Sequence, residues 1–202
     1  MARKKSLFTD LVNDYKGLLL TDKRDGMKDL LEYMEDCKFF DAPCSGGNHL
    51  CEPGGLVKHS LNVYHIAKEL TMALYGDNIP DGFAMSVGTC ALLHDVGKCG
   101  DYGKQLYVPN ILKSGEQSKA KPYERNKQLT NVPHAFRSVI IAERFIDLTE
   151  EEEWAIMYHD GLYDRETGGM AIVPGHETPL WMIIHWSDMW ASHVTEIEKE
   201  DE

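Results

Sequence analysis

The sequence carries little positive charge. Its 202 residues include 21 lysines and arginines against 33 aspartates and glutamates, which gives a net charge of −12 at pH 7. Negative charge of this size repels a phosphate backbone, so we expect no duplex nucleic acid among the partners. A small anionic substrate requires positive charge to gather locally. Residues 100–132 gather it, since this segment has a net charge of +3.

The chain also begins without a long apolar run. Asp10, Asn13 and Asp14 interrupt the apolar positions of residues 1–20, which therefore match neither a secretory leader nor a membrane span. Cysteines are few: there are 5, and an odd number favours reduced thiols over a disulfide framework. We therefore expect a cytoplasmic protein that does not associate with membranes.

Three of the cysteines, Cys37, Cys44 and Cys51, recur every seven residues, with His49 between the last two. Three thiolates and one imidazole can form a zinc site, but the close CxxC pair of most structural zinc sites is missing. Reduced cysteines in a helix end and a loop are the favoured interpretation.

No linker rich in proline, serine or glycine divides the chain, so we expect a single domain over residues 1–202. Apolar residues recur at helical spacing through most of it. Two amphipathic helices are expected within residues 1–40, the first over Ser6–Leu20. A long helix then begins after the glycine pair of "EPGGLVKHS" and ends at Gly76.

The middle of the chain combines a buried helix with an irregular segment. The stretch "GFAMSVGTCALLHDVGK" is apolar nearly all round, which is typical of a buried central helix, and His94-Asp95 lies at its carboxyl end. Residues 100–132 have no helical period and predict a β-hairpin or lid with a Ser-Gly turn.

Helical pattern returns after this segment, in "HAFRSVIIAERFI" and "TEEEEWAIMYH". In the second stretch Thr149 and Glu152 have the spacing of a capping box. A loop over Gly161–Thr178 leads to a last apolar helix over Pro179–Ile197. The sequence thus predicts an all-α domain with a small β-hairpin insertion.

The dipeptide His94-Asp95 is not specific by itself. With 9 histidines and 16 aspartates, random order would give roughly 0.7 such dipeptides, and a second one stands at His159-Asp160. Its interpretation depends on partners elsewhere in the chain.

Such partners exist on four other segments, so that the candidate ligands come from five segments in all. Divalent metals are held by imidazole nitrogen and carboxylate oxygen, and one helix end supplies only one or two of these ligands. Asp188 stands in the apolar stretch "MIIHWSDMWA", where an unpaired carboxylate facing the core would be costly. A solvent-facing carboxylate or a structural ion pair is the alternative for Asp188. The candidate metal ligands are His59, His94, Asp95, His134, His159 and Asp188.

These residues carry a family resemblance. "GGLVKHS", then "ALLHDVGK", then an aspartate in an apolar helix resemble the H…HD…D pattern of the HD-domain superfamily of metal-dependent phosphohydrolases. The resemblance covers roughly Asn48–His193 and implies a helical bundle. "VPHAFRS" and "MYHDGLYD" lie where two-metal members, such as HD-GYP phosphodiesterases and some HD exoribonucleases, have extra histidines. The GYP triplet itself is missing from "GLYDRETGG", so the chain departs from the cyclic-di-GMP enzymes.

The resemblance also implies the cofactors. His59, His94, Asp95 and Asp188 would surround one divalent metal, and Asp95 would bridge to a second one. Manganese, iron, magnesium, cobalt and nickel all suit these ligands, with a transition metal favoured at the histidine-rich second site. Two such cations can activate a water molecule and neutralise phosphate oxygens.

Catalytic roles are expected for Asp95 and Lys98. The resemblance suggests that Lys98 contacts the substrate phosphate or steadies Asp95; the alternative is a lysine facing the helix dipole. Charged residues of the 100–132 segment are otherwise more often solvated than bound to substrate. The candidates for substrate binding are Lys98, His49, Lys121, Arg125 and Arg137.

The expected function is hydrolysis of a phosphoester or phosphodiester bond in a nucleotide or related small molecule by a metal-activated water. One alternative is a 3′ to 5′ exonuclease on single-stranded nucleic acid, whose activity would fall steeply with salt. Another is a non-catalytic ligand-binding or partner-binding module in which metals only stabilise the fold. The last helix, which contains Trp181, Trp186 and Trp190, offers a surface for a homodimer.

Overall fold

Helices account for most of the fold. The computed structural model describes residues 2–161, 163–164, 169–170 and 175–197. Over these ranges the α-helices are α1 (Ala2–Leu19), α2 (Met27–Asp36), α3 (Gly55–Tyr75), α4 (Phe83–Leu93), α5 (His134–Ala142), α6 (Glu150–Met157) and α7 (Pro179–Trp190). Shorter turns are the 3-10 turns η1 (Phe39–Asp41) and η2 (Val96–Cys99) and the π-helical turn η3 (Ala191–Thr195). The expected all-α fold is confirmed.

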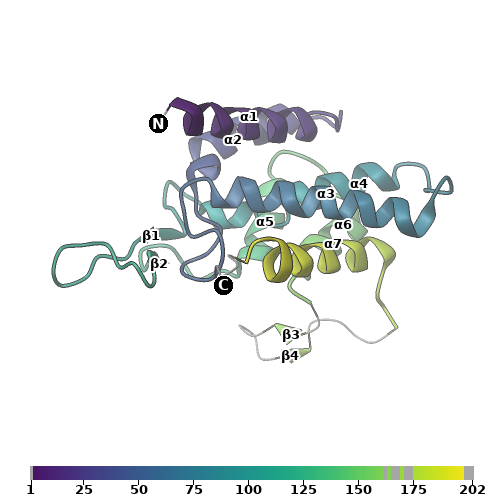
Figure 1. Ribbon diagram of the computed structural model, residues 1–202. Helices are drawn as coiled ribbons and strands as arrows, with labels where there is room; N and C mark the ends of the chain where they lie inside the picture. The colour runs from purple at the N-terminus through teal and green to yellow at the C-terminus, as the bar shows by residue number, and fades with distance from the viewer. Residues whose placement is uncertain (1, 162, 165–168, 171–174, 198–202) are drawn as a thin grey trace.

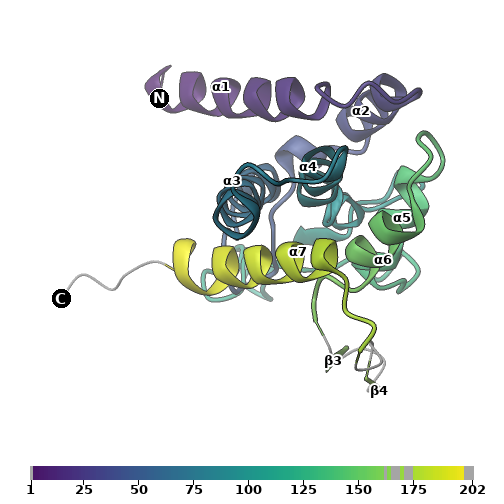
Figure 2. The same cartoon turned by 90° about the vertical axis from the view of Figure 1, so that its right-hand side faces the viewer.

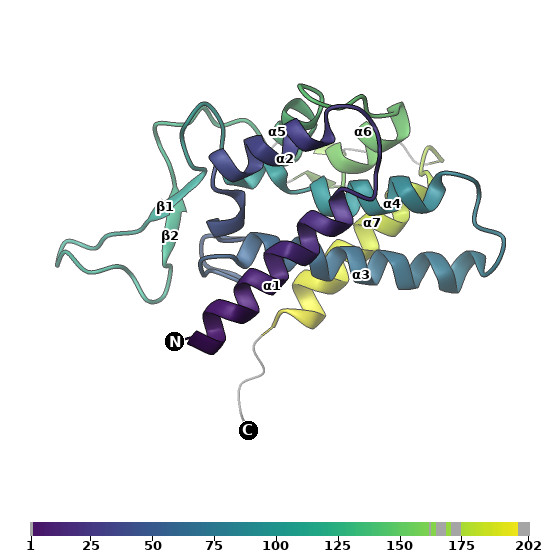
Figure 3. The same ribbon diagram turned by 90° about the horizontal axis from the view of Figure 1, so that it is seen from above.

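The helices are arranged in layers (Figure 1, Figure 2). In the middle, α3 lies beside α4, and α7 packs against both of them from one side. The helices α5 and α6 lie on the same side as α7, while α1 and α2 lie on the opposite side. Seen from above, α1 crosses α3 at an angle (Figure 3).

The hydrophobic core of the described residues runs through these layers. It includes Tyr15 of α1 and Trp181 of α7, both almost fully buried. The Tyr15 hydroxyl donates a hydrogen bond to the Leu92 carbonyl oxygen at 2.6 Å, which anchors α1 to the end of α4. The small residues of α4 allow a close approach to α3, because a Cβ atom at Gly88 would lie 3.3 Å from the Tyr64 ring.

The acidic run before Trp154 begins α6, as the capping box predicts. Thr149 Oγ1 accepts a hydrogen bond from the Glu152 amide, and the Glu152 carboxylate accepts one from the Thr149 amide. Glu152 is buried, and both of its carboxylate oxygens accept hydrogen bonds from Arg24 at 2.9 Å. This pairing attaches the segment between α1 and α2 to the start of α6.

The predicted hairpin is present in the 100–132 segment. Strands β1 (Tyr107–Pro109) and β2 (Tyr123–Arg125) pair antiparallel, with Val108 opposite Glu124. The strands are short, and the rest of the segment is loop. A second small pair, β3 (Tyr163–Asp164) and β4 (Gly169–Met170), lies in the loop expected over Gly161–Thr178, much of which falls outside the described residues.

The carboxyl end of the fold differs from the prediction of one helix through Ile197. Helix α7 ends at Trp190, and η3 then widens the helix by one residue per turn, which changes the direction in which Glu196 points. Trp186, Met189 and Trp190 are exposed on this part of the chain. The homodimer stays a prediction.

Among the described helices, none is long and apolar enough to span a bilayer.

Candidate metal centre

The fold brings all six candidate metal ligands together. His59 comes from α3, His94 and Asp95 follow α4, and Asp188 comes from α7. His134 is the first residue of α5, and His159 stands just after α6. His59, His94, Asp95 and His159 are almost fully buried, so the centre lies at the meeting point of five helices.

The first ligand group surrounds His59. Its Nε2 atom lies 3.0 Å from Asp188 Oδ1, 3.2 Å from His94 Nε2 and 3.4 Å from Asp95 Oδ2. His94 Nε2 is also 3.4 Å from Asp95 Oδ2. The ligand atoms of His59, His94 and Asp95 lie close enough together to reach one divalent cation, and Asp188 lies beside them next to His59.

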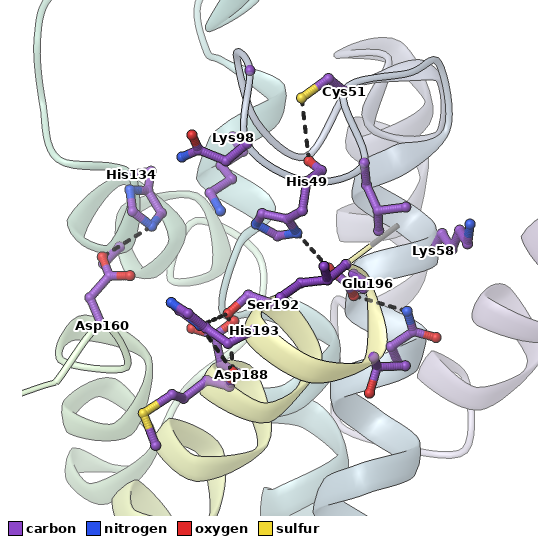
Figure 4. Close-up of a pocket in the computed structure, with 18 of the residues that line it drawn as sticks. His49, Cys51, Lys58, Lys98, His134, Asp160, Asp188, Ser192, His193 and Glu196 are labelled. Atoms are coloured by element: carbon purple, nitrogen blue, oxygen red, sulfur yellow. Dashed lines mark hydrogen bonds and ion pairs between the residues drawn. The ribbon is translucent and has the colours of Figure 1, made fainter. Parts of the chain in front are cut away.

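The second ligand group uses the other oxygen of Asp95. Asp95 Oδ1 lies 3.3 Å from His134 Nε2 and 3.5 Å from His159 Nε2. The Asp160 carboxylate joins them, with Oδ2 at 3.3 Å from His134 Nε2, as Figure 4 shows. Asp160 is 56% exposed, so this group opens toward solvent. Asp95 therefore stands between the two groups with one oxygen directed to each.

Some buried polar atoms of the two ligand groups have no hydrogen-bond partner. Asp95 Oδ1, Asp95 Oδ2 and His134 Nε2 are buried, and within the described part of the chain none has a hydrogen-bond partner. Lys98 Nζ lies 2.6 Å from Asp95 Oδ2 as an ion pair without hydrogen-bond geometry. Buried polar atoms are normally satisfied, so these residues fit one or two divalent cations placed between them.

The Nδ1 contacts of two histidines orient their rings toward the centre. His94 Nδ1 lies 2.9 Å from the Ala91 carbonyl oxygen, and His159 Nδ1 lies 2.7 Å from the Ile156 carbonyl oxygen. A carbonyl only accepts, so each Nδ1 carries a proton and each Nε2 faces the centre, where its unprotonated form can offer a lone pair. Orientation of this kind is typical of metal-ligating histidines.

A family comparison agrees with this geometry. The model of the HD domain matches residues 56–188, which is more than half of the chain and includes all six candidate ligands. The chain belongs to the HD-domain family. Members of this family are generally metal-dependent hydrolases, and the converged histidines and aspartates of this HD domain suit a metal site. Searches of curated proteins and of solved structures found no match.

Charge within the HD-domain site is unevenly distributed. Burial would raise the pKa of Asp95, but the charges of Lys98 and His94 lower it well below its usual value. Burial and the Lys98 charge lower the pKa of His134 to about 4, so its imidazole is neutral at pH 7. At His159 burial is outweighed by Asp160 and Asp95, which raise its pKa to about 9. Cation binding at the second group therefore has to release the His159 proton.

The glycine of "HDVGK" explains how the two ligand groups come so close. A Cβ atom at Gly97 would lie 2.2 Å from the His134 carbonyl oxygen, so only glycine lets η2 approach the start of α5. The Gly97 amide donates a hydrogen bond to Ser138 Oγ at 2.9 Å, which holds the two elements in register. This contact sets the distance between Asp95 and His134.

A cavity of about 1480 Å³ opens over the centre. Its wall includes the ligands His134 and Asp188, and Figure 4 shows both beside the cavity. Three lysines from separate elements also line it: Lys58, Lys98 and Lys119. The same wall carries four carboxylates, so the lysines supply local positive charge within a mixed lining: Glu52, Asp160, Asp188 and Glu196.

The candidates for substrate binding divide into two sets. Lys98 and His49 line the cavity. Lys121 and Arg125 do not: Lys121 is exposed next to Gly47, and Arg125 Nη1 donates a hydrogen bond to Asn131. Lys119, two residues before Lys121, lines the cavity.

Arg137 lies inside the fold rather than on the cavity wall. It is buried, its Nη2 donates a hydrogen bond to the Thr130 carbonyl oxygen at 2.8 Å, and its Nη1 lies 3.5 Å from Asp101 Oδ2. These contacts favour a structural role over the substrate contact that the sequence suggested.

The regularly spaced cysteines do not converge on one ion. Cys37 Sγ lies 2.7 Å from Cys99 Sγ, whereas Cys51 Sγ lies 3.1 Å from Ser45 Oγ. Cys44 alone approaches a histidine, with its Sγ 4.0 Å from His49 Nε2. The three cysteines therefore lie in separate surroundings and do not gather around His49.

Two acidic residues of the centre were not among the candidates from the sequence. Asp160 belongs to the second His-Asp dipeptide, and that repetition was the available signal. Glu196 gave no signal, because it lies in a polar stretch outside the HD pattern. The structure buries its carboxylate against His49 Nδ1 and His59 Nδ1, and Figure 4 shows Glu196 facing His49.

Proposed function

We propose that this HD-domain protein hydrolyses a phosphoester or phosphodiester bond of a nucleotide or related small molecule. The proposal depends mainly on the position of the Asp95 carboxylate. Its two buried oxygens face separate groups of histidines, and neither accepts a hydrogen bond within the described residues. A carboxylate in that position is suited to bridge two cations. Two-metal sites are common in enzymes that cleave phosphate esters.

The residues that would hold the cations follow from the distances. His59, His94 and Asp188 would share one cation with Asp95 Oδ2, and His134, His159 and Asp160 would share another with Asp95 Oδ1. When bound, such ions lower the proton affinity of water and neutralise phosphate oxygens. Manganese, iron, magnesium, cobalt and nickel remain the candidates, with a transition metal favoured at the second, histidine-rich group.

The remaining charged residues would position the substrate. Lys98 is kept protonated, because its ion pair with Asp95 outweighs its burial and raises its pKa. Its ammonium group lines the cavity beside the centre, where it can pair with a phosphate oxygen. Lys58 and Lys119 also line the cavity and would attract the anion toward the centre.

His49 would contact the substrate at the cavity wall. Burial alone would lower the pKa of this imidazole, but its contacts with Cys44 and Glu196 raise it to about 9. A protonated His49 can donate to a phosphate or sugar oxygen through Nε2, while its Nδ1 bonds Glu196. A small phosphorylated substrate in the cytoplasm is the partner that this arrangement favours.

The size of the cavity favours a second candidate, a 3′ to 5′ exonuclease on single-stranded nucleic acid. Pockets for small molecules usually measure about 300–1,000 Å³, and this cavity of about 1480 Å³ has room for more than one nucleotide. The two activities differ in salt dependence, because a strand that contacts several lysines binds more weakly as salt increases.

The test is a substrate screen on metal-loaded protein. Metal content is measured first, and then nucleoside monophosphates, nucleoside triphosphates, cyclic dinucleotides and single-stranded oligonucleotides are assayed at several salt concentrations. Turnover that Asp95→Asn abolishes and Asp77→Asn preserves would support the proposal, because Asp77 is an exposed aspartate beyond the end of α3. If metal-loaded protein turns over none of these and Asp95→Asn leaves ligand binding intact, the non-catalytic module is correct.

A further inference from the structure

Two thiols that do not line the cavity contact each other between α2 and η2. Cys37 is the first residue after α2, and Cys99 is the last residue of η2. Their Sγ atoms lie 2.7 Å apart, although 62 residues separate them in the chain. Neither residue lines the cavity described above.

The approach of these sulfurs is fixed by a neighbouring contact. Tyr33 precedes Cys37 by one helical turn and therefore lies on the same face of α2. Its hydroxyl donates a hydrogen bond to Asp101 Oδ1 at 2.6 Å, and Asp101 also accepts two hydrogen bonds from Arg144 at 2.9 Å and 2.6 Å. The end of α2 thus contacts the η2 region at two adjacent points, the Tyr33–Asp101 hydrogen bond and the Cys37–Cys99 contact. The first of these contacts helps to keep the two sulfurs close together.

The other cysteines have different surroundings. All five lie in described residues as free thiols, and the sulfurs of Cys37 and Cys99 are the pair for which a contact is present. Cys44 lies 4.0 Å from Lys98 Nζ, Cys51 contacts Ser45, and Cys90 is buried beside the Glu152 carbonyl oxygen. A second pairing would require these elements to move.

The two thiols of the pair also differ in access. Cys37 is half-buried, so a small oxidant can reach it, whereas Cys99 is 1% exposed. Burial raises the pKa of the Cys99 thiol, which keeps it protonated. Cys37 is therefore the thiol that meets the oxidant, and Cys99 is placed to react next.

We propose that Cys37 and Cys99 form a reversible disulfide when the protein meets a peroxide. The Cys37 thiolate attacks one peroxide oxygen, which breaks the O–O bond and gives a sulfenic acid and hydroxide. The Cys99 sulfur then attacks the Cys37 sulfur, the S–O bond breaks, and the oxygen leaves as water. Two thiols are oxidised by two electrons in total, and the peroxide is reduced to two molecules of water.

This disulfide would attach α2 to the turn that follows His94-Asp95. The closed loop contains the whole of α3 and α4, and with them the ligands His59, His94 and Asp95. Closing a loop of this length restricts the unfolded chain more than the folded one, so the oxidised protein gains thermal stability. Disulfides of cytosolic proteins are usually transient and respond to redox conditions, which suits a pair that rests as thiols.

The experiment is a mass measurement on full-length, magnesium-loaded protein treated with hydrogen peroxide. Trypsin places the two cysteines in separate peptides, residues 29–38 and 99–104. We expect these peptides to be joined after oxidation, with the loss of two hydrogens, and separated again by dithiothreitol. The midpoint of thermal unfolding should rise by roughly 5–10 °C on oxidation.

Variants assign the effect to the pair. Cys37→Ser should abolish both the joined peptides and the rise in the unfolding midpoint, and Cys99→Ser should do the same. Cys37→Ser carries the test by itself if the buried Cys99 does not tolerate serine. The matched control is Cys51→Ser, a half-buried cysteine outside the pair, which should keep both effects.

Three results would overturn the proposal. One is an oxidised Cys37 that stays unlinked, and another is a disulfide that contains Cys44, Cys51 or Cys90. The third is a Cys37–Cys99 link that forms without any change in the unfolding midpoint, which would contradict the stabilisation expected from closing the loop.

Discussion

Glu196 Oε1 accepts a hydrogen bond from His59 Nδ1 at 3.0 Å, across 137 residues of the chain. The proton on Nδ1 leaves Nε2 free to face Asp188 and Asp95. Asn62 Nδ2 donates a second hydrogen bond to the same carboxylate at 2.9 Å. Although burial would raise the pKa of Glu196, its bonds to His49 and His59 lower it to about 2, so it is ionised at any pH at which the site functions.

Glu196→Ala should therefore weaken the first cation site. Without the carboxylate His59 is free to rotate, and loss of such a supporting contact typically costs about 10–100-fold in metal affinity. Metal titration followed by calorimetry would measure the change. Glu69→Ala, at an exposed position of α3, is the matched control and should bind as the unaltered protein does. Equal affinities in the two variants would contradict the role of Glu196.

Asp95→Asn should cost activity more than fold. Asparagine has one oxygen ligand instead of two, so it cannot serve both cation sites, and the metal content should fall by about one ion per chain. Turnover should fall by at least about 100-fold. Metal analysis and a circular dichroism spectrum on the same sample separate the two effects. A variant with full metal content and full turnover would exclude a bridging role.

Lys98→Met should lower turnover without releasing metal. The aliphatic part of the side chain is retained, but the charge beside Asp95 Oδ2 is lost. We expect kcat to fall by roughly 100-fold, which is typical of losing one group that stabilises transition-state charge. Lys98→Arg should recover part of kcat. If both variants fold and turn over normally, Lys98 only neutralises the dipole at the end of α4.

Asp101 should make stability depend on pH in acid. Burial would raise the pKa of Asp101, but the hydrogen bonds from Arg144 and Tyr33 outweigh it and lower the pKa to about 2. The unfolded chain has a value of about 3.9. The contribution, roughly 2 kcal/mol, is therefore complete above pH 4 and is lost as the pH falls toward 2.

The comparison of Asp101→Asn with the unaltered protein measures this contribution. The unfolding midpoints should differ by roughly 5 °C at pH 6. The difference should shrink between pH 4 and pH 2, because protonation removes the same charge from the unaltered protein. A difference that stays constant over this range would mean that the Arg144 bonds do not depend on ionised Asp101.

The sequence predicts the fold and the six candidate ligands for one physical reason. Helical periodicity and buried polar residues are local signals, and Asp188 in an apolar helix is conspicuous without any structure. Long-range geometry leaves no such signal. Arg137 and Lys121 look alike in the sequence as basic residues near the candidate ligands, yet the fold buries the first against Asp101 and leaves the second exposed.

The π-helical turn explains why Glu196 could not be foreseen. A regular α-helix continued from α7 would have pointed this residue elsewhere. The wider turn at Ala191–Thr195 brings its carboxylate back to His59. The change from α-helix to π-helix at η3 therefore places Glu196 in the site.

The Nδ1 contacts of the histidines also differ in how early they can form. His94 and His159 each bond a carbonyl oxygen three residues back, within a single helical turn, so local folding is enough to aim them. His59 is aimed by a partner near the other end of the chain. His59 therefore acquires its orientation only once η3 packs against α3, whereas the orientation of His94 and His159 requires a single helical turn.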